Sequence, residues 1–350
     1  MRVYAAFDDP RLPLREVPAY AQRAERMGFS GLLVPEAVHD GFLTALLALE
    51  HTTTIQIVTS VVLAFPRSPM TTAYAAWDLQ AISGGRFALG LGSQVKGNIV
   101  GRFGVEWKPP VARMRDYVRA VRAAWSCFQS GEKLSFESEH YTLDRMQPFF
   151  NPGPIDHPDI PIFLGGVNPG MTRLAGEVAD GFMTHPTNTN PRYLREVTKP
   201  DIERGAARAR REPTGVRLIA STFVATGPTL ADVRSERERL REYLAFLYST
   251  PQYWRTLELH GWQDVGQRLH QLSREGKWAE MKEVVSDEIL DRLVAAGTYD
   301  EIVATLHDWY GNLATGITLR MPDHLQHDDR LARVISALRN SRFQIPKSTD

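Results

Sequence analysis

The chain has 350 residues and balanced charge, with 41 lysines and arginines against 41 aspartates and glutamates. A hydrophobic content of 43% and a charged content of 23% are globular values, which exclude disordered and fibrous classes. We expect no nucleic-acid partner, because the chain has no basic footprint, and no membrane span, because no stretch approaches about 18 apolar residues. Cys127 is the single cysteine, which excludes an intramolecular disulfide. No secretory signal opens the chain, so we expect a soluble, cytoplasmic protein.

Short apolar runs alternate with amphipathic stretches along the first half of the chain. The runs predict strands over residues 2–7, 31–35, 55–63 and 86–91. The stretches predict helices over residues 17–27, 42–51, 70–82 and 111–129. Strands that are almost wholly apolar and alternate with helices indicate a parallel sheet covered on both faces.

The same alternation resumes in the second half. It predicts strands over residues 162–164, 181–184, 216–225 and 316–321, and helices over residues 171–179, 192–211 and 328–339. Residues 226–315 are mostly helical in pattern. Eight strand–helix units favour a (β/α)8 TIM barrel with a helical insertion between strands 7 and 8, over an open doubly wound sheet. We therefore expect one domain over residues 1–345, with the insertion at 226–315 and a frayed tail at 346–350.

Polar residues follow the second predicted strand, at the end where a barrel carries its active site. Glu36, His39 and Asp40 lie within five residues of one another. Two of them also have simpler interpretations. Asp40 could be the N-cap of the next helix, and His39 could be an ordinary surface residue.

The third and fourth strands each carry a second kind of candidate. Ser60 and Val61 place a hydroxyl among β-branched residues, which either completes a barrel layer or approaches a flat ring from beneath. Gly92, Ser93 and Gln94 belong to a glycine-rich turn whose backbone N–H groups could face a ligand. Its spacing, GxGxxxxG, departs from the dinucleotide fingerprint.

The fifth strand ends in Gly165 and Gly166, just ahead of a helix. Free N–H groups at a helix start bind anions and phosphates. A plain turn, with Asn168 as cap and Pro169 in the first helical position, is compatible with that function. The sixth strand ends at His185, a second histidine at the same rim.

A metal site is not expected. The ten histidines are scattered, no HExxH motif occurs, and one cysteine offers no thiolate cluster. His324 and His327 lie beyond the last strand, at a solvated helix start. The chain therefore has the features of a barrel that takes its reactivity from an organic cofactor.

An ordered set of segments resembles the bacterial-luciferase-like superfamily of flavin- and deazaflavin-dependent oxidoreductases. The resemblance runs from residue 1 to about residue 190 and returns near the eighth strand. The segments are residues 24–29 (AERMGF), 34–36 (VPE), 64–69 (AFPRSP), 82–93 (ISGGRFALGLGS), 102–104 (RFG), 113–117 (RMRDY), 179–181 (ADG) and 297–302 (GTYDEI).

The resemblance implies a cofactor at the carboxyl-end rim, either coenzyme F420 or FMN. Ser60–Val61 is similar to the position where deazaflavin members have a cis peptide behind the ring, and this similarity favours the F420-dependent subgroup. The resemblance further assigns cofactor contacts to Glu36, Asp40, Gly92, Ser93, Gln94, Gly165 and Gly166. Two residues depart from the family pattern: Ala37 stands where a histidine is usual, and Gln94 where a glutamate is usual. Both departures remove candidate acid–base groups. We therefore do not expect this chain to have the sugar-phosphate dehydrogenase activity of some family members.

The leading hypothesis is F420-dependent hydride transfer with an unidentified small organic substrate. His39 would move the proton, with Glu36 beside it and His185 as the competing catalytic group. An FMN-dependent monooxygenase is the first alternative, a non-redox phosphate-binding barrel enzyme the second, and a non-catalytic binding protein the third. Aromatic residues at 103, 107, 253 and 254 predict an apolar substrate cleft, and apolar outer helices make a homodimer a reasonable expectation.

Overall fold

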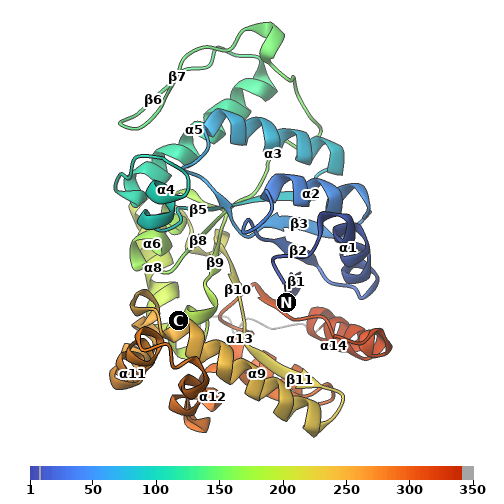
Figure 1. Ribbon diagram of the computed structural model, residues 1–350. Coiled ribbons are helices and arrows are strands. Elements are labelled where there is room, and N and C mark those ends of the chain that lie inside the picture. The colour runs from blue at the N-terminus through green and yellow to red at the C-terminus, as the bar shows by residue number, and fades with distance from the viewer. Residues whose placement is uncertain (8, 341–350) are drawn as a thin grey trace, which may run out of the picture.

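The computed structural model describes residues 1–7 and 9–340, and its centre is a closed barrel of parallel strands (Figure 1). The strands pair in the order β3–β2–β1–β13–β10–β9–β8–β5, and pairing between β3 and β5 closes the ring. The predicted (β/α)8 fold is therefore confirmed. Its strands are β1 (Arg2–Ala6), β2 (Gly31–Val34), β3 (Gln56–Thr59), β5 (Phe87–Gly92), β8 (Ile162–Gly166), β9 (Gly181–Thr184), β10 (Arg217–Ala220) and β13 (Gly316–Thr318). The predicted tail at 346–350 lies outside the described residues.

Side chains fill the inside of the barrel. Successive strand residues point to opposite faces, so each strand contributes alternate residues to this core. Ala6 and Val61 pack against it from the carboxyl ends of the strands. The barrel is thus a packed core that supports a site at its carboxyl-end face. The buried inner residues are Tyr4, Leu33, Val58, Ala88, Phe163, Met183 and Ile219.

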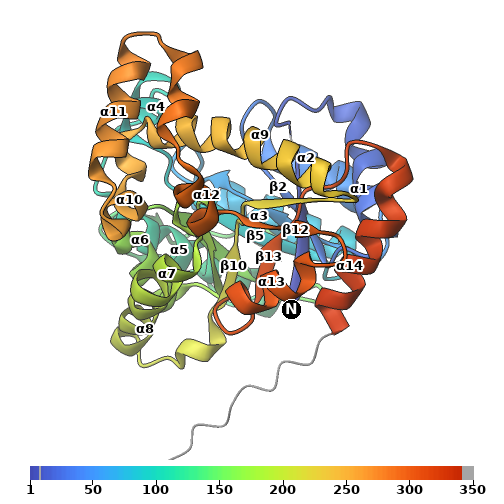
Figure 2. The ribbon, with the colours of Figure 1, turned by 90° about the horizontal axis from the view of Figure 1, so that it is seen from below.

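The outer helices surround the barrel (Figure 2). Most begin and end within two residues of the predicted positions, because proline or a capping side chain starts them and Gly84 and Gly131 end two of them in left-handed conformations. Among the described residues, no helix is long and apolar enough to cross a membrane. The helices are α1 (Val17–Arg26), α2 (Gly41–Glu50), α3 (Pro69–Ser83), α4 (Lys96–Gly101), α5 (Pro110–Ser130), α6 (Pro169–Val178), α7 (Pro191–Tyr193), α8 (Lys199–Arg208), α13 (Ile302–Tyr310) and α14 (Asp328–Asn340).

The strand predicted over residues 216–225 is wrong as a single element. It divides into β10 within the barrel and β11 (Val224–Gly227), which pairs with β12 (Ala295–Thr298) outside it. Between them, the N–H of Ser221 donates to Thr184 Oγ1 at 3.0 Å, and that of Thr222 donates to Thr318 Oγ1 at 2.9 Å. Where the chain leaves the barrel, the backbone N–H groups thus donate to side-chain hydroxyls instead of to the carbonyls of a neighbouring strand.

Two other predicted elements are interrupted. The third strand breaks at Ser60–Val61, and its continuation is the short β4 (Val62–Leu63). The helix over 192–211 contains a π-helical segment, Leu194–Thr198, before α8. Pro200 at the start of α8 has no N–H to donate to the preceding turn, which accounts for the changed hydrogen-bond pattern.

The segment between β11 and β12 forms a helical unit with its own buried cluster. It sits on the carboxyl-end face, because Tyr248 Oη and Thr256 Oγ1 both donate to the carbonyl of Thr187, at 3.1 and 2.5 Å. A hairpin of β6 (Phe136–Glu137) and β7 (Thr142–Leu143) projects beyond α5 (Figure 1). The helices of the insertion are α9 (Leu230–Tyr248), α10 (Arg255–His260), α11 (Gln263–Arg274) and α12 (Asp287–Leu293) (Figure 2).

Candidate functional site

Val61 forms a platform at the mouth of the barrel. The Ser60–Val61 peptide is cis, as expected for this position. The Val61 side chain lies over two glycines, because a Cβ at Gly92 would be 2.4 Å from its Cγ2 and a Cβ at Gly165 would be 2.8 Å from its Cγ1. Three predicted positions, on β5, β8 and the third strand, therefore meet at one point. We call this arrangement of Val61, Gly92 and Gly165 the Val61 platform.

Arg67 joins the two predicted carboxylates of the β2 rim. Its Nη2 lies 2.5 Å from Glu36 Oε1 and 2.6 Å from Asp40 Oδ2, and Glu36 Oε2 also accepts from the N–H of Leu63 at 2.7 Å. Burial alone would lower the pKa of Arg67, but the hydrogen bonds and charges of Glu36 and Asp40 outweigh it and raise the pKa. The three side chains form a charged cluster at the edge of the mouth.

Asp40 has a second structural task. Its Oδ1 accepts from the N–H groups of Phe42 and Leu43, which caps the start of α2. The capping alternative considered for Asp40 is thus correct, and the other carboxylate oxygen is bound to Arg67. Direct contact between Asp40 and a cofactor stays a prediction.

His39 lies on the same loop and is partly exposed. Among the described residues it forms no hydrogen bond, so its ring nitrogens are available. The loop itself is held by the segment that follows β5, because Arg102 Nη2, just after α4, donates to the carbonyl of Ala37 at 2.9 Å.

His185 is held more firmly than His39. Its ring stacks on Tyr253 of the insertion, with centroids 4.4 Å apart and planes 17° apart. Its Nδ1 accepts from the N–H of Thr187 and lies 2.8 Å from Thr187 Oγ1, so the neutral ring carries its proton on Nε2. Burial lowers the pKa of His185 to about 4, which keeps the ring neutral near pH 7.

The turn after β5 is closed mainly by its own atoms. Gln94 adopts a left-handed conformation with φ of 56°, and its Oε1 accepts from the N–H of Val95 at 2.9 Å, next to the start of α4. Ser93 Oγ donates to the carbonyl of Gln94 at 3.3 Å. The Gln94 amide nitrogen and the Ser93 hydroxyl oxygen are the groups that this turn offers to a ligand.

The turn after β8 leads directly into α6. Asn168 occupies the N-cap position and Pro169 follows it, as predicted, but the Asn168 side chain makes no capping hydrogen bond. Asn188 Nδ2 donates to the carbonyl of Val167 at 2.8 Å and fixes the turn to the loop after β9. The start of α6 beside Gly165 and Gly166 therefore has no side-chain cap and is suited to an anion.

Sequence reasoning missed Arg67 and Thr187. Arg67 lies inside a segment that carried the family resemblance, so its place in the chain could have singled it out. Thr187 had no such signal, because its contact with His185 depends on the loop conformation. Within the described part of the chain, no group of three or more histidine, cysteine, aspartate or glutamate side chains could hold a metal ion.

The sequence matches the model of one protein family, described as luciferase-like monooxygenase, over residues 3–316. The chain belongs to this family. It is therefore an oxidoreductase, and the non-redox barrel enzyme and the non-catalytic binding protein are set aside.

Sequence relatives agree with this placement. An uncharacterised protein of Mycobacterium tuberculosis is 42% identical over 284 residues, which cover 81% of this chain and 83% of that protein. The 5,10-methylenetetrahydromethanopterin reductase of Archaeoglobus fulgidus is 27% identical over 308 residues, which cover 85% and 87% of the two chains.

Solved structures share the fold. The coenzyme F420-dependent tetrahydromethanopterin reductase of Methanopyrus kandleri superposes with a TM-score of 0.76 at 20% identity, covering 96% of each chain. The EDTA monooxygenase of Chelativorans sp. BNC1 superposes with a TM-score of 0.73 at 15% identity, covering 96% of this chain and 93% of that one. The luciferase-like barrel thus occurs in proteins described as reductases and as monooxygenases.

Proposed function

We propose that this luciferase-like oxidoreductase uses coenzyme F420 to transfer a hydride to or from a small organic substrate. The observation that carries the proposal is the Val61 platform, which lies beside the uncapped start of α6. The names of relatives support the choice of cofactor, since the Methanopyrus kandleri protein of the same fold is described as F420-dependent. FMN remains the alternative cofactor.

The residues present fit such a cofactor. Residues 92 and 165 have no Cβ, and a Cβ at either would occupy the space of the Val61 side chain. A flat ring can therefore rest on Val61, while Gly165, Gly166 and the N–H of Gly170, in the first turn of α6, bind its phosphate. When bound, F420 supplies the carbon that accepts or donates the hydride.

Other contacts would orient the ring. Ser60 lies beside Val61, and Ser93 and Gln94 present polar atoms at the end of β5. Glu36, held by Arg67, offers a fixed carboxylate at the end of β2. We propose these four residues, with Asp40 behind Glu36, as further cofactor contacts.

We propose that one histidine transfers the proton and that the other forms a hydrogen bond with the substrate. The ring nitrogens of His39 form no hydrogen bond with a described residue, and histidine is the most common general acid–base side chain, so His39 is the candidate acid–base group. His185 is neutral and carries its proton on Nε2, so it can donate a hydrogen bond to a substrate oxygen. Its stacking partner Tyr253 would contribute an aromatic wall to the substrate cleft.

The second candidate function is an FMN-dependent monooxygenase. The description of the matching family and the fold shared with EDTA monooxygenase favour it. The two functions differ in their need for oxygen, because a deazaflavin has carbon in place of the ring nitrogen that a flavin uses to activate oxygen.

An oxygen-controlled assay tests the proposal. The purified protein is mixed with reduced F420 and a panel of ketones, aldehydes and imines under nitrogen, and the return of oxidised F420 is followed by absorbance. We expect at least one acceptor to be reduced without oxygen. Turnover seen only with reduced FMN, and only with oxygen present, would establish the monooxygenase instead.

We further propose a cytoplasmic location and a homodimeric assembly. The apolar outer surface of α2 supports the assembly.

A further inference from the structure

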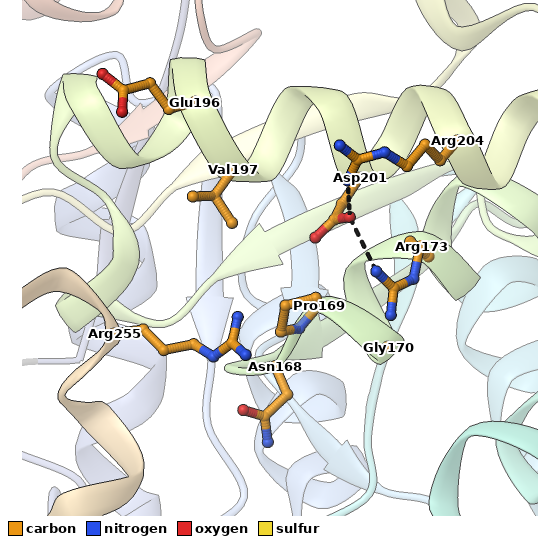
Figure 3. Close-up of a pocket in the computed structure, with 9 residues that line it drawn as sticks. All are labelled: Asn168, Pro169, Gly170, Arg173, Glu196, Val197, Asp201, Arg204 and Arg255. Carbon is orange, nitrogen blue, oxygen red and sulfur yellow. Dashed lines mark hydrogen bonds and ion pairs between the residues drawn. The ribbon is translucent and has the colours of Figure 1, made fainter. Parts of the chain in front are cut away.

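An open pocket of about 600 Å³ adjoins the turn after β8. It lies between α6, the π-helical segment, α8 and α10 (Figure 3). Asn168, which lines it, is two residues beyond Gly166, so their Cα atoms are at most about 8 Å apart. The pocket is therefore next to the proposed phosphate site. Its lining residues are Asn168, Pro169, Gly170, Arg173, Glu196, Val197, Asp201, Arg204 and Arg255, and we call it the arginine pocket.

Two of its arginines are fixed by one buried carboxylate. Asp201 Oδ1 lies 3.2 Å from Arg173 Nη1 and 2.7 Å from Arg204 Nη1, and its side chain is only 3% exposed. A guanidinium has five N–H donors, and these ion pairs each use one Nη1. Both arginines thus keep donors for a ligand while Asp201 holds their positions.

The third arginine comes from the insertion. Arg255, at the start of α10, points across the pocket toward Asn168 and Pro169 (Figure 3). Its side chain interacts with the Tyr193 hydroxyl, and it takes part in none of the ion pairs between described residues, so most of its N–H donors remain for a ligand. The pocket's other acid, Glu196, pairs with Arg192 at 3.1 Å, outside the lining.

Charge and geometry both favour an anion here. Three arginines face two carboxylates, of which one is shared by two arginines and the other is paired elsewhere. The uncapped start of α6 adds the positive end of a helix dipole. Guanidinium groups bind carboxylates and phosphates through paired hydrogen bonds, so the pocket suits a chain that carries several such groups.

We propose that the arginine pocket binds the acidic tail of F420, an inference that rests on the proposed function. F420 continues beyond its phosphate into a chain of glutamates, whereas FMN ends at the phosphate. A cofactor whose phosphate lies at Gly165 and Gly166 would send that chain past Asn168 into the pocket. The insertion then contributes to cofactor affinity through Arg255, separately from any role in substrate binding.

Fluorescence titration tests this inference without turnover. The probes are F420 with several glutamates and the same deazaflavin–ribityl compound without phosphate or tail. Arg255→Ala should weaken the binding of F420 about fivefold, the scale of one partly exposed charge pair, and leave the tail-less compound unchanged. Arg255→Lys should restore most of the affinity. The loss should shrink as salt rises.

Arg26→Ala is the matched control, because it removes one exposed positive charge from α1, remote in sequence from the pocket, and should change neither affinity. If Arg255→Ala binds F420 as tightly as the wild type, or loses both probes equally, the tail site is wrong and the proposed function stands. If the wild type binds neither deazaflavin, the proposed function fails and this inference fails with it.

Discussion

Two histidines lie on different loops, one after β2 and one after β9, and their surroundings differ. His39 is partly exposed and its ring nitrogens bind no described residue, whereas His185 is stacked and hydrogen-bonded. Once a substrate is found, His39→Ala should lower kcat about a hundredfold or more, because a positioned acid–base group contributes roughly that much. Cofactor affinity should be kept. Glu36→Ala, in contrast, should mainly weaken cofactor binding.

A different outcome would assign the acid–base role to His185 instead of His39. Full turnover by His39→Ala together with a large loss in His185→Ala would place the acid–base group after β9.

Burial of His185 should make folding sensitive to acid. Its pKa is lowered to about 4 in the folded protein, against an ordinary 6.5. Between those values the unfolded chain takes up a proton that the folded chain refuses, so the free energy of unfolding falls as the pH drops from 6.5 to 4. The full loss from this group is about 3 kcal/mol.

Denaturant unfolding of the wild type and of His185→Gln, at pH 7 and pH 4, measures this effect. Between pH 7 and pH 4 the free energy of unfolding should fall less for the variant than for the wild type. The wild type loses the contribution of His185 in addition to that of all other titrating groups. Equal losses would show that His185 is not buried as described.

Among single residues, the sequence predicted the roles of those whose partners lie close by in the chain. Asp40 was identified both as a helix cap and as a rim carboxylate, and it is in fact a cap that also binds Arg67. Arg67 was missed because its partners lie 31 and 27 residues away, on another loop. Only the folded barrel brings those loops together.

The Val61 platform is the element on which the cofactor proposal depends most. Gly92→Ala would place a Cβ 2.4 Å from Val61 Cγ2. Val61 must then shift, so we expect F420 affinity to fall at least tenfold and stability to fall by about 1–3 kcal/mol, the usual cost of overpacking.

Gly97→Ala is the matched control, because a Cβ there would meet no atom within 4 Å. It should leave affinity unchanged and leave stability equal or slightly raised. Isothermal titration and thermal unfolding of both variants provide the comparison. A Gly92→Ala protein with normal affinity would mean that the ring does not rest on Val61.

Elements were predictable where one pattern determined them. Six outer helices, α1, α2, α3, α5, α6 and α14, were predicted to within two residues of their ends, because proline, capping side chains and glycine mark those ends. The short helices α4 and α7, and α13, were not predicted as separate elements. The strand over 216–225 was not, because its two halves are equally apolar and only their partners differ: β10 pairs within the barrel and β11 pairs with β12. No local pattern distinguishes two pairings of one apolar run.

On the scale of the whole molecule, α2 has an apolar surface that the barrel does not cover. Its sequence, GFLTALLALE, contains one charged residue, and Leu43 is 56% exposed. Helices that are apolar on all sides are usually covered on all sides. We expect a second copy to cover this face.

Sedimentation equilibrium tests the assembly. The wild type should be a dimer and Leu43→Lys a monomer, since a buried charge without a partner is costly. Leu230→Lys changes a leucine of similar exposure at the start of α9 and should stay dimeric. A monomeric wild type would contradict the assembly.

The eightfold alternation of strands and helices was enough to predict the barrel. It could not predict how the insertion docks, because Thr187 accepts hydrogen bonds from Tyr248 and Thr256, which lie 61 and 69 residues further along the chain. That docking places Tyr253 on His185 and Arg255 beside α6. The parts of the site that come from the insertion therefore emerge only from the structure.

The ratio of two dissociation constants tests the central proposal most directly. Purified protein is stripped of any bound cofactor and titrated with F420 and with FMN under identical salt and pH, with fluorescence as the readout. A phosphate site alone would bind both, whereas the Val61 platform and the arginine pocket together should favour F420 at least tenfold. Equal affinities, or tighter binding of FMN, would contradict the assignment of F420 as the cofactor.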